Sequence, residues 1–585
     1  MEALWDDYGS TIEFAMAFSL FALSTYVALR AGVLSLAAVP FAAVTGFVSL
    51  VLIEDHGVAV ELVLVIGVGL GALSALLVGL PLLRLESHWI ALATIAFVLM
   101  ARVVVLNIED VTGGSQGKPV TRTIETWEVL FVLVLAAWIM ARHRRSRLGL
   151  AAEAVRNHPD VAASLGVHVV GIRRRMLMVS GAIAGLAGVV FANLVQFLSP
   201  DTFYVNVAFV MLAAVVLGGA FHWSGAIAGA FVFTLLPELL RNYLTEGERI
   251  VNGILLILVM IFMPRGLIDP SRRLRRRIKT DARAHDKADT TEDAEFWDLN
   301  LTGATIESVS KGVGDGVALE VRNVTKAYGG LLAVKDLTFQ VAEGSTFGVI
   351  GPNGAGKSTL LSLIDGSVLP DEGQVVLFGE DVSGLTPHEI ASRQVSRTYQ
   401  TVQLFEDLTV LENIMVGFHR HRVTGFWDPV LMTKRDRREH AELEGQAREL
   451  MDRVGVIGRP DQYAATLSYA NQRRVEIARA LAASPRLLLM DEPTAGMHKL
   501  GTQAVGELIL ELRDQGLTVV VIEHNLELVI NYCERAVVMD FGELLCEGLP
   551  TDCLAQPNVI EAYFGRKADA QRIESLLELR KHPGG

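Results

Sequence analysis

The nine residues from Gly351 to Thr359, with the sequence GPNGAGKST, constrain the fold of this chain most strongly. The apolar run from Phe347 to Ile350 predicts a buried strand before them, and the leucine-rich residues 360–364 predict a helix after them. A glycine-rich loop between a strand and a helix turns its backbone N–H groups inward around phosphates. The sequence therefore predicts a binding site for a nucleoside triphosphate.

The residues of this loop have separate expected roles. The Lys357 amine is expected to reach the β- and γ-phosphates, and the Ser358 hydroxyl is expected to hold Mg²⁺. The full set expected to contact the nucleotide is Gly351, Asn353, Gly354, Gly356, Lys357, Ser358 and Thr359.

The two halves of the 585-residue chain differ in composition. Hydrophobic residues make up 51% of the sequence, yet the charged residues crowd into the second half. The net charge of −13, without a basic patch in the soluble half, argues against nucleic acid as a partner. We expect a membrane domain over residues 1–279, a flexible polar linker over 280–316, an α/β domain over 317–566 and a tail over 567–585.

Long apolar stretches recur through residues 1–279 and predict a polytopic, all-helical membrane domain in contact with lipid. About nine crossings are expected, with the shorter ones tilted, interrupted or buried against their neighbours. The stretches are Ile12 to Leu29, Val33 to Ile53, Leu62 to Leu83, Trp89 to Leu106, Trp127 to Met140, Leu177 to Phe197, Val205 to Leu217, Gly225 to Leu240 and Val251 to Met263.

Basic residues indicate the orientation of these crossings. Arginines are concentrated in residues 142–147 and 173–175, and a second basic run, residues 272–279, follows the last crossing. The positive-inside rule places all three of these basic ranges in the cytoplasm and the acidic N-terminus outside. Because residues 1–10 carry no Lys or Arg, we expect no cleavable signal peptide.

Three further features of the membrane half have open interpretations. Two groups of closely spaced glycines predict tight helix packing: Gly67, Gly69 and Gly71, and Gly181, Gly185 and Gly188. Arg102 and Glu238 either line a polar pathway or reach the membrane surface from span ends. The loop 148–170 predicts two short helices parted at Pro159, which form a docking element for a motor domain or a connector on the membrane surface.

In the soluble half, two carboxylates follow the apolar strand pattern that ends at Met490. The carboxyl end of such a strand is where an open α/β sheet binds its ligand. Asp491 is therefore expected to hold Mg²⁺, and Glu492 to orient the attacking water. After a third strand pattern, Thr518 to Ile522, His524 is expected either to sense the γ-phosphate or to be structural.

The sequence has three cysteines, Cys533, Cys546 and Cys553, without metal-ligand spacing. We expect them to be reduced thiols.

Residues 467–481, LSYANQRRVEIARAL, resemble the signature segment of ABC transporter ATPases. Gln400 resembles the Q-loop glutamine of that family, and Tyr328 resembles its adenine-stacking aromatic residue. The resemblance implies ATP as the nucleotide and places Gln400 among the catalytic and Mg²⁺-binding groups. It also implies that Ser468 and Ala470 contact the nucleotide held by an opposite ATPase.

Both halves resemble the branched-chain amino acid (Liv-type) uptake systems, as a permease fused to its ATPase. The segments that carry this resemblance include residues 112–115, 163–167, 263–267, 522–526 and 559–565. The resemblance implies a multi-pass protein of a bacterial-type inner membrane, in which the loop 148–170 docks on a cytoplasmic ATPase domain. Its expected partners are a second permease and a second ABC ATPase, paralogous rather than identical, and an extracytoplasmic binding protein. Branched-chain or other small amino acids are the expected substrates.

Two departures from the family pattern concern the nucleotide sites. Ala470 and Asn471 stand where the family has Gly and Gln, and His498 stands where it has Asn or Asp. Since signature and phosphate loop come from different subunits, these changes are expected to affect the site built on the partner's phosphate loop. Other functions compatible with the sequence are an importer for urea or short amides, an exporter half-unit, and a membrane receptor with a degenerate ATPase.

Overall fold

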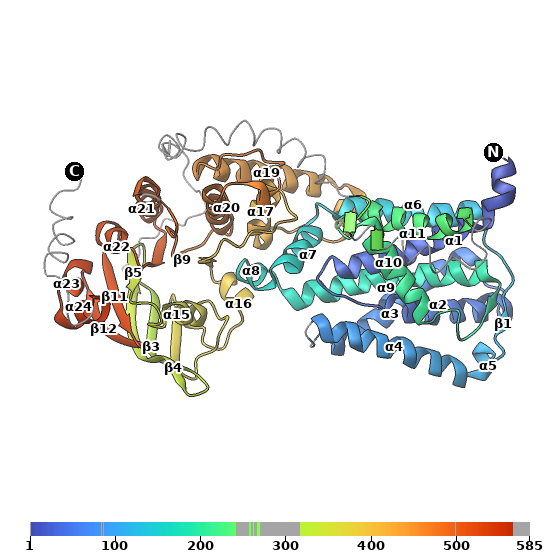
Figure 1. The fold of residues 1–585 in the computed structure, drawn as a ribbon, viewed down its shortest axis with the longest axis horizontal. Coiled ribbons are helices and arrows are strands. Elements are labelled where there is room, and N and C mark those ends of the chain that lie inside the picture. The colour runs from blue at the N-terminus through green and yellow to red at the C-terminus, as the bar shows by residue number, and fades with distance from the viewer. Residues whose placement is uncertain are drawn as a thin grey trace. The chain divides into compact units, whose positions relative to one another are not determined.

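The computed structural model describes residues 2–83, 85, 87–240, 257–258, 261–262, 266–268, 316–497 and 499–564. The chain forms two compact units (Figure 1). The helical unit comprises Met1–Asn157, Val169–Lys279 and Gly425–Thr433. The α/β unit comprises His158–His168, Thr280–Thr424 and Lys434–Gly585. The predicted linker 280–316, except Gly316, and the predicted tail 567–585 lie outside the described residues.

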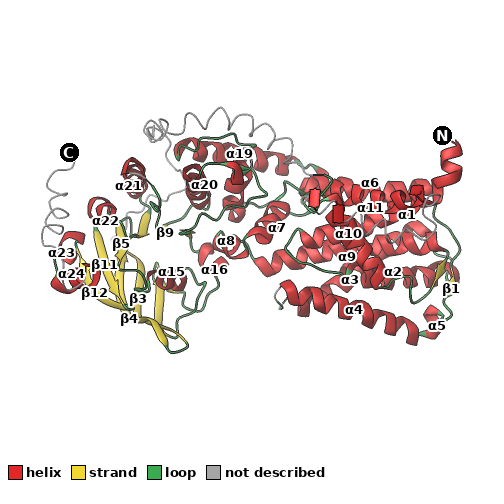
Figure 2. Ribbon diagram, in the orientation of Figure 1, coloured by secondary structure: helices red, strands yellow, loops and turns green. Residues whose placement is uncertain are grey.

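The described part of the helical unit is helical apart from its loops and one two-stranded pair, as Figure 2 shows. Its helices are α1 (Glu2–Leu29), α2 (Ala38–Leu50) with the π-helix η1 (Val51–Asp55), α3 (Val60–Leu82), α4 (Ser87–Asn107), α5 (Glu109–Thr112), α6 (Thr126–His143), α7 (Arg147–Asn157), α9 (Val169–Val195), α10 (Val205–Gly218), α11 (Trp223–Leu240) and α18 (Trp427–Leu431). The antiparallel pair is β1 (Lys118–Pro119) with β2 (Phe197–Leu198).

Six helices of the described residues are long and apolar enough to cross a membrane. They are α1, α2 with η1, α3, α4, α6 and α9. Their positions match the first six predicted crossings, whereas the seventh and eighth, at Val205–Leu217 and Gly225–Leu240, stay predictions. Their helices α10 and α11 form a pair bent by 118° at a short break. The 14 residues of α10 extend only about 21 Å, less than the hydrocarbon thickness of a bilayer. The ninth predicted crossing falls largely outside the described residues.

Close glycine contacts pack α3 against α9. A Cβ atom added to Gly71 would lie 2.1 Å from the Gly181 carbonyl oxygen, and one on Gly185 would lie 2.0 Å from that of Gly67. Since real Cβ atoms do not approach so closely, only glycine allows these two backbones to meet. An added Cβ on Gly69 has no neighbour within 4 Å, so Gly69 does not share in this packing.

Two ion pairs, one buried and one partly buried, each join a helix of this unit to a distant segment. Arg122 donates to both oxygens of Glu13, at 3.1 and 2.6 Å. Arg30 pairs with Glu153 at 3.1 Å and also donates to the carbonyl oxygens of Arg144 and Gly149. Each pair joins residues more than 100 positions apart.

Arg102 and Glu238 were the sequence candidates for a polar pathway. Arg102 pairs at 2.8 Å with the exposed Asp201, and its own side chain is 36% exposed. This placement agrees with a position at a span end. Glu238 is partly buried near the end of α11.

The α/β unit contains a six-stranded sheet in the order β12-β11-β5-β10-β9-β8, parallel except between β11 and β12. A four-stranded antiparallel sheet has the order β4-β3-β6-β7. The strands are β3 (Val317–Tyr328), β4 (Leu331–Ala342), β5 (Thr346–Ile350), β6 (Glu372–Leu377), β7 (Glu380–Asp381), β8 (Val395–Thr398), β9 (Leu487–Asp491), β10 (Thr518–Ile522), β11 (Arg535–Asp540) and β12 (Glu543–Gly548). Strands β5, β9 and β10 are buried at every position, as their apolar runs predict.

The helices of the α/β unit pack against these sheets or against one another. They are α8 (Pro159–Ser164), α15 (Lys357–Ile364), α16 (Pro387–Ser392), α17 (Val410–Gly417), α19 (Lys434–Arg453), α20 (Tyr469–Ala482), α21 (Lys499–Asp514), α22 (Leu526–Tyr532), α23 (Pro550–Leu554) and α24 (Pro557–Phe564), with the 3₁₀ turns η2 (Phe418–Arg420) and η3 (Ala464–Thr466). The fold is therefore the predicted all-α membrane domain followed by an α/β domain of the phosphate-loop NTPase class.

The loop 148–170 contains two helices, α7 and α8, and α8 begins at Pro159, as predicted. Although His158–His168 comes between two membrane segments in sequence, it belongs to the α/β unit. There the His158 ring lies 6.5 Å from the Phe405 ring, and the His168 ring lies 4.5 Å from the His388 ring.

The expectation of three reduced thiols was wrong for two of the cysteines. Cys546 and Cys553 form a disulfide, because the turn between β12 and α23 brings their Cα atoms to 5.6 Å. Cys533 is free and buried, and burial raises the pKa of its thiol to about 12.

Candidate nucleotide-binding and hydrolysis site

Four neighbouring parallel strands bring the predicted site residues to one edge of the six-stranded sheet. Strands β5, β10, β9 and β8 lie side by side in that order, so their carboxyl ends face the same edge. The phosphate loop follows β5, His524 follows β10, Glu492 follows β9 and Gln400 follows β8. These residues are up to 173 positions apart in sequence, and the sheet order alone assembles them.

The phosphate loop needs glycine at three positions for different reasons. Gly356 has φ +97°, and a Cβ on it would lie 2.2 Å from the Ala333 carbonyl oxygen. A Cβ on Gly351 would lie 2.3 Å from the Met539 carbonyl oxygen. Gly354 has φ +87° and no neighbour within 4 Å, so it needs glycine for its backbone angle and borders open space.

Polar side chains of this loop divide between buried and exposed. Asn353 and Ser358 are exposed, Thr359 is partly buried, and Lys357 is only 6% exposed. The Lys357 ammonium donates to the carbonyl oxygens of Gly351 and Pro352, at 2.7 and 2.9 Å. Burial lowers the pKa of Lys357, whereas Glu492 and Asp491 act to raise it.

Asp491 is held by a buried arginine and keeps one oxygen without a partner. Arg397 donates to Asp365 at 2.6 Å and to Asp491 Oδ2 at 3.0 Å. Burial raises the pKa of the Asp491 carboxyl, and the Arg397 charge opposes this rise. The Asp491 Oδ1 atom is buried and makes no hydrogen bond. A buried carboxylate oxygen of this kind calls for a cation or a bound water.

This free oxygen is the test of whether the residues fit Mg²⁺. Mg²⁺ prefers oxygen ligands, usually one or two from the protein with the rest from water and phosphates. Asp491 Oδ1 and the exposed Ser358 hydroxyl are such ligands, and they fit the ion. Among the described residues, no cluster of three or more His, Cys, Asp or Glu side chains offers a metal site made by protein alone.

Glu492, Gln400 and His524, three residues singled out in the sequence, lie together. The Gln400 amide donates to Glu492 Oε2 at 2.9 Å, and His524 Nδ1 lies 3.7 Å from the same oxygen. Glu492 has a left-handed backbone with φ +44°, which is unusual for a residue other than glycine. Its N–H donates to the Ile522 carbonyl oxygen at 2.9 Å, which helps to hold this angle.

Arg473 fixes the backbone around this group, a role for which no sequence motif singled it out. Arg473 is fully buried in α20. It donates to the carbonyl oxygens of Tyr399, Gln400 and Glu492, and it pairs with Glu476 at 2.7 Å. Glu476 in turn accepts the Tyr399 N–H at 3.2 Å. The only signal for this role is an arginine and a glutamate three positions apart in a helix, which is usually a surface pair.

Glu523 also has a role that the sequence did not reveal. Its carboxylate is fully buried and accepts the backbone and hydroxyl groups of Thr494, at 2.9 and 2.6 Å. It also accepts the N–H groups of His524 and Asn525. It therefore shapes the turns on either side of Glu492 and His524.

In the part of the chain that the structure describes, Ser468, Ala470 and Tyr328 form no hydrogen bond or ion pair with this cluster. Ser468 is exposed just before α20, and Ala470 is partly buried in its first turn. Asn471 is buried and donates to the Ser468 hydroxyl at 3.1 Å, so its amide holds the turn in shape. Tyr328 ends β3 and is 50% exposed, with the Lys326 ammonium 5.8 Å from its ring centre. His498 lies outside the described residues.

The hydroxyl of Tyr399, the residue next to Gln400, forms a hydrogen bond with Ser164 of α8. Burial raises the pKa of the Tyr399 hydroxyl to about 12, and the hydrogen bond with Ser164 opposes that rise. The Arg397 guanidinium lies over the Tyr399 ring, 5.0 Å from its centre. One residue thus links the 158–168 segment to the Gln400 backbone.

Comparison with known proteins gives two family matches. Residues 9–262 match the family described as branched-chain amino acid transport system / permease component, and residues 334–495 match the ABC transporter family.

Curated relatives match the α/β half. The branched-chain amino acid transport ATP-binding protein BraF of Pseudomonas aeruginosa is 39% identical over 248 residues, which are 42% of this chain and 97% of BraF. LivG of Escherichia coli K12, named likewise, is 36% identical over the same shares. The lipopolysaccharide export system ATP-binding protein LptB of the same strain is 34% identical over 247 residues, again 42% of this chain and 97% of LptB. Among solved structures, a nucleotide-free ATP-binding cassette from an ABC transporter is 32% identical, with a TM-score of 0.38, over 43% of this chain and all of its own.

Proposed function

From the premise that this chain belongs to the ABC transporter family, as a permease component of the branched-chain amino acid type fused to an ATPase, we propose that it is half of an ATP-driven importer. Its proposed substrates are branched-chain or other small amino acids, delivered by an extracytoplasmic binding protein. One observation carries the proposal: Glu492, Gln400 and His524 meet beside the phosphate loop of a chain whose first half matches that permease family.

The chain's own residues supply the parts that phosphoryl transfer needs. Lys357 releases the carbonyl oxygens of its loop and turns its ammonium to the phosphates. Asp491 and Ser358 would hold Mg²⁺, which would neutralise charge on the phosphate oxygens when bound. Glu492, oriented by Gln400, positions the attacking water and accepts its proton. His524, 3.7 Å from Glu492, senses the γ-phosphate.

The segment 158–168 supports the coupling of hydrolysis to transport. It belongs to the α/β unit, and its Ser164 bonds to Tyr399, whose neighbour Gln400 holds Glu492. A displacement of Gln400 on nucleotide binding would move Tyr399 and α8 together. This is the docking role proposed for the loop 148–170.

The exposed signature residues support a partner ATPase. Ser468 and Tyr469 are exposed, so their backbone is accessible to the nucleotide on a second subunit. A Cβ at position 470 restricts the backbone where the family has glycine. We therefore propose that the second permease and ATPase are paralogous subunits and that the two nucleotide sites differ.

The basic loops support a cytoplasmic α/β domain in a bacterial-type inner membrane. With the N-terminus outside, α6 ends in the cytoplasm at Arg142 to Arg147, and α9 returns to the outside. If α10 and α11 enter and leave on one side, the apolar stretch 251–263 brings the basic residues 272–279 back to the cytoplasm. If α10 and α11 together made one crossing, the basic residues 272–279 would lie outside. We therefore favour an arrangement in which α10 and α11 enter and leave on the same side.

Three other functions remain alternatives. An ATPase half similar to LptB is compatible with export, but the permease family match favours uptake. Urea or short amides are the second substrate class. A receptor with a degenerate ATPase is the third, and the intact Lys357, Asp491 and Glu492 argue against it.

The proposal is tested by uptake into vesicles that hold this chain with its partner subunits and a binding protein. Labelled leucine, other amino acids and urea would be compared between the wild type and Glu492→Gln. ATP-driven uptake of leucine that is lost in Glu492→Gln is the expected result. Efflux instead of uptake would assign the chain to the exporters, and transport of urea alone would change the substrate class.

A further inference from the structure

The segment Gly425–Thr433, GFWDPVLMT, follows the phosphate loop in sequence but belongs to the helical unit. Its helix α18 packs on α6. The Phe426 ring stacks on the ring of His143, the last residue of α6, with centroids 4.1 Å apart and planes 29° apart. An element of the second half of the chain thus contacts the end of the fifth membrane span.

One side of this segment is buried. Pro429 and Val430 are inside, and Phe426 lines a small cavity with Tyr26, Met140 and Met176. Asp428 fixes the shape of the segment, because it accepts the Gly425 N–H at 2.8 Å and the Thr433 hydroxyl at 2.9 Å. The segment is therefore an ordered element and not a loose loop.

The other side exposes large apolar side chains. Trp427 is 61% exposed and Leu431 is 68% exposed. They are four positions apart in α18, so they share one face. The helix on which α18 packs also exposes apolar side chains along its length, including Phe131 and Trp138, as a lipid-facing span does. An exposed Trp and Leu beside such a span suit the boundary of the bilayer, where Trp is enriched.

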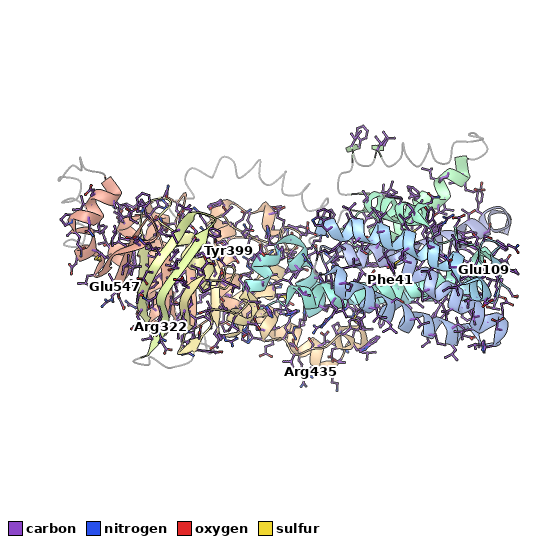
Figure 3. The ribbon with its side chains drawn as sticks, turned by 90° about the horizontal axis from the view of Figure 1, so that it is seen from below. Phe41, Glu109, Arg322, Tyr399, Arg435 and Glu547 are labelled. Atoms are coloured by element: carbon purple, nitrogen blue, oxygen red, sulfur yellow. A yellow bond between two sulfur atoms is a disulfide. The ribbon has the colours of Figure 1, made fainter. Side chains whose placement is uncertain are left out.

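Basic residues adjoin this apolar face in sequence. Arg142, in the last turn of α6, and Arg145, just after the helix, are exposed. Lys434 and Arg435 follow the segment and are also exposed. Figure 3 shows Arg435 projecting from the surface. Apolar anchors next to cations are the pattern of segments that lie in the interface of a membrane with anionic lipids.

We propose that Gly425–Thr433 is an interfacial anchor, with Trp427 and Leu431 inserted into the headgroup region of the cytoplasmic leaflet. Phe426 attaches the anchor to the end of α6. The adjacent basic residues meet anionic lipid headgroups. The orientation of this anchor rests on the proposed function, because that proposal places the end of α6 in the cytoplasm.

The test is the accessibility of spin labels at single sites. Trp427→Cys and Leu431→Cys would be labelled in the full chain, reconstituted with its partner subunits in vesicles of phosphatidylcholine and phosphatidylglycerol. Phe541→Cys is the matched control, since Phe541 is an 84% exposed apolar residue of the α/β unit. We expect labels at 427 and 431 to collide several-fold more often with oxygen than with a water-soluble nickel complex, and the label at 541 to show the reverse.

Two results would overturn the anchor. Ready access of the nickel complex to both labels would place the segment in water, and protection from both reagents would show a covering protein subunit. A second measurement needs no label: brominated lipids should quench wild-type tryptophan fluorescence more than that of Trp427→Phe, and equal quenching would count against the proposal. If either test fails while ATP-driven uptake is observed, the anchor is overturned and the proposed importer function is not. Lipid-accessible labels without uptake would support the anchor and contradict the importer function.

Discussion

The two units bury charged side chains for different purposes. In the helical unit, the buried Glu13 pairs with the partly buried Arg122, and the buried Arg30 pairs with Glu153, so that each pair joins a helix to a distant segment. In the α/β unit, Arg473 and Arg397 hold backbone and carboxylate groups around the nucleotide site. The comparison teaches that a buried charge ties elements together in the first unit, whereas in the second it positions the groups that act on a ligand.

Loss of Arg473 should have the largest effect. Arg473→Met removes the 2.7 Å partner of the buried Glu476 and leaves it only the more distant Arg479, at 3.8 Å. Breaking a buried pair in this way costs about 3–5 kcal/mol in the free energy of unfolding. This change in the free energy of unfolding is measured by denaturing the whole chain and monitoring the unfolding of the α/β unit by proteolysis. Arg459→Met is the control, since its pair with Asp461 is exposed and contributes about 0–1 kcal/mol. Equal effects of the two changes would show that the burial of Arg473 adds nothing to the free energy of unfolding.

Asp491→Asn should come next and should act on turnover. It keeps the shape of the side chain but removes the charge of the free Oδ1, and we expect ATP hydrolysis to fall about 10²-fold with a weaker response to Mg²⁺. Titration of hydrolysis with Mg²⁺ checks this.

The matched control is Asp365→Asn, because Asp365 pairs with the same Arg397 but uses its other oxygen on the Ser367 N–H at 2.8 Å. It should lower stability and leave the Mg²⁺ dependence unchanged. If both variants shift that dependence alike, Asp491 does not bind the ion.

Packing of the helical unit should be weakened by Gly71→Val. The new side chain would collide with the Gly181 carbonyl oxygen, at a cost of about 1–3 kcal/mol, while Gly69→Val would point into open space. Unfolding in mixed detergent and SDS micelles compares them. Because both variants change the same helix in the same way, their difference isolates the contact with α9. Similar unfolding curves would contradict that contact.

The hydroxyl contact between Tyr399 and Ser164 should have the smallest effect. A double-mutant cycle of Tyr399→Phe and Ser164→Ala should give a coupling energy of about 0.5–1.5 kcal/mol in substrate-stimulated hydrolysis. Basal hydrolysis serves as the reference for each variant. Strictly additive effects would remove this contact from the path between α8 and Gln400.

Local patterns were enough to predict the strands, the phosphate loop and most spans. The all-buried strands β5, β9 and β10 have continuous apolar runs, and the loop between β5 and α15 has a fixed glycine pattern. The bend between α10 and α11 was missed, because two apolar stretches look alike whether they cross a membrane or fold back. The disulfide between Cys546 and Cys553 was missed because cysteine spacing does not reveal a turn.

Lys357, Asp491, Glu492 and His524 could be proposed as reacting groups from the sequence, since all four follow recognisable strand patterns. Their contacts follow only from the tertiary structure. Gln400 donates to Glu492, Arg473 donates to the carbonyl oxygens of both residues, and one oxygen of Asp491 makes no hydrogen bond. The tertiary structure also decided that Gly71 packs closely and Gly69 does not. The physical reason is that strand and helix patterns depend on residues a few positions apart, whereas these contacts depend on how the sheet order and helix packing bring distant segments together.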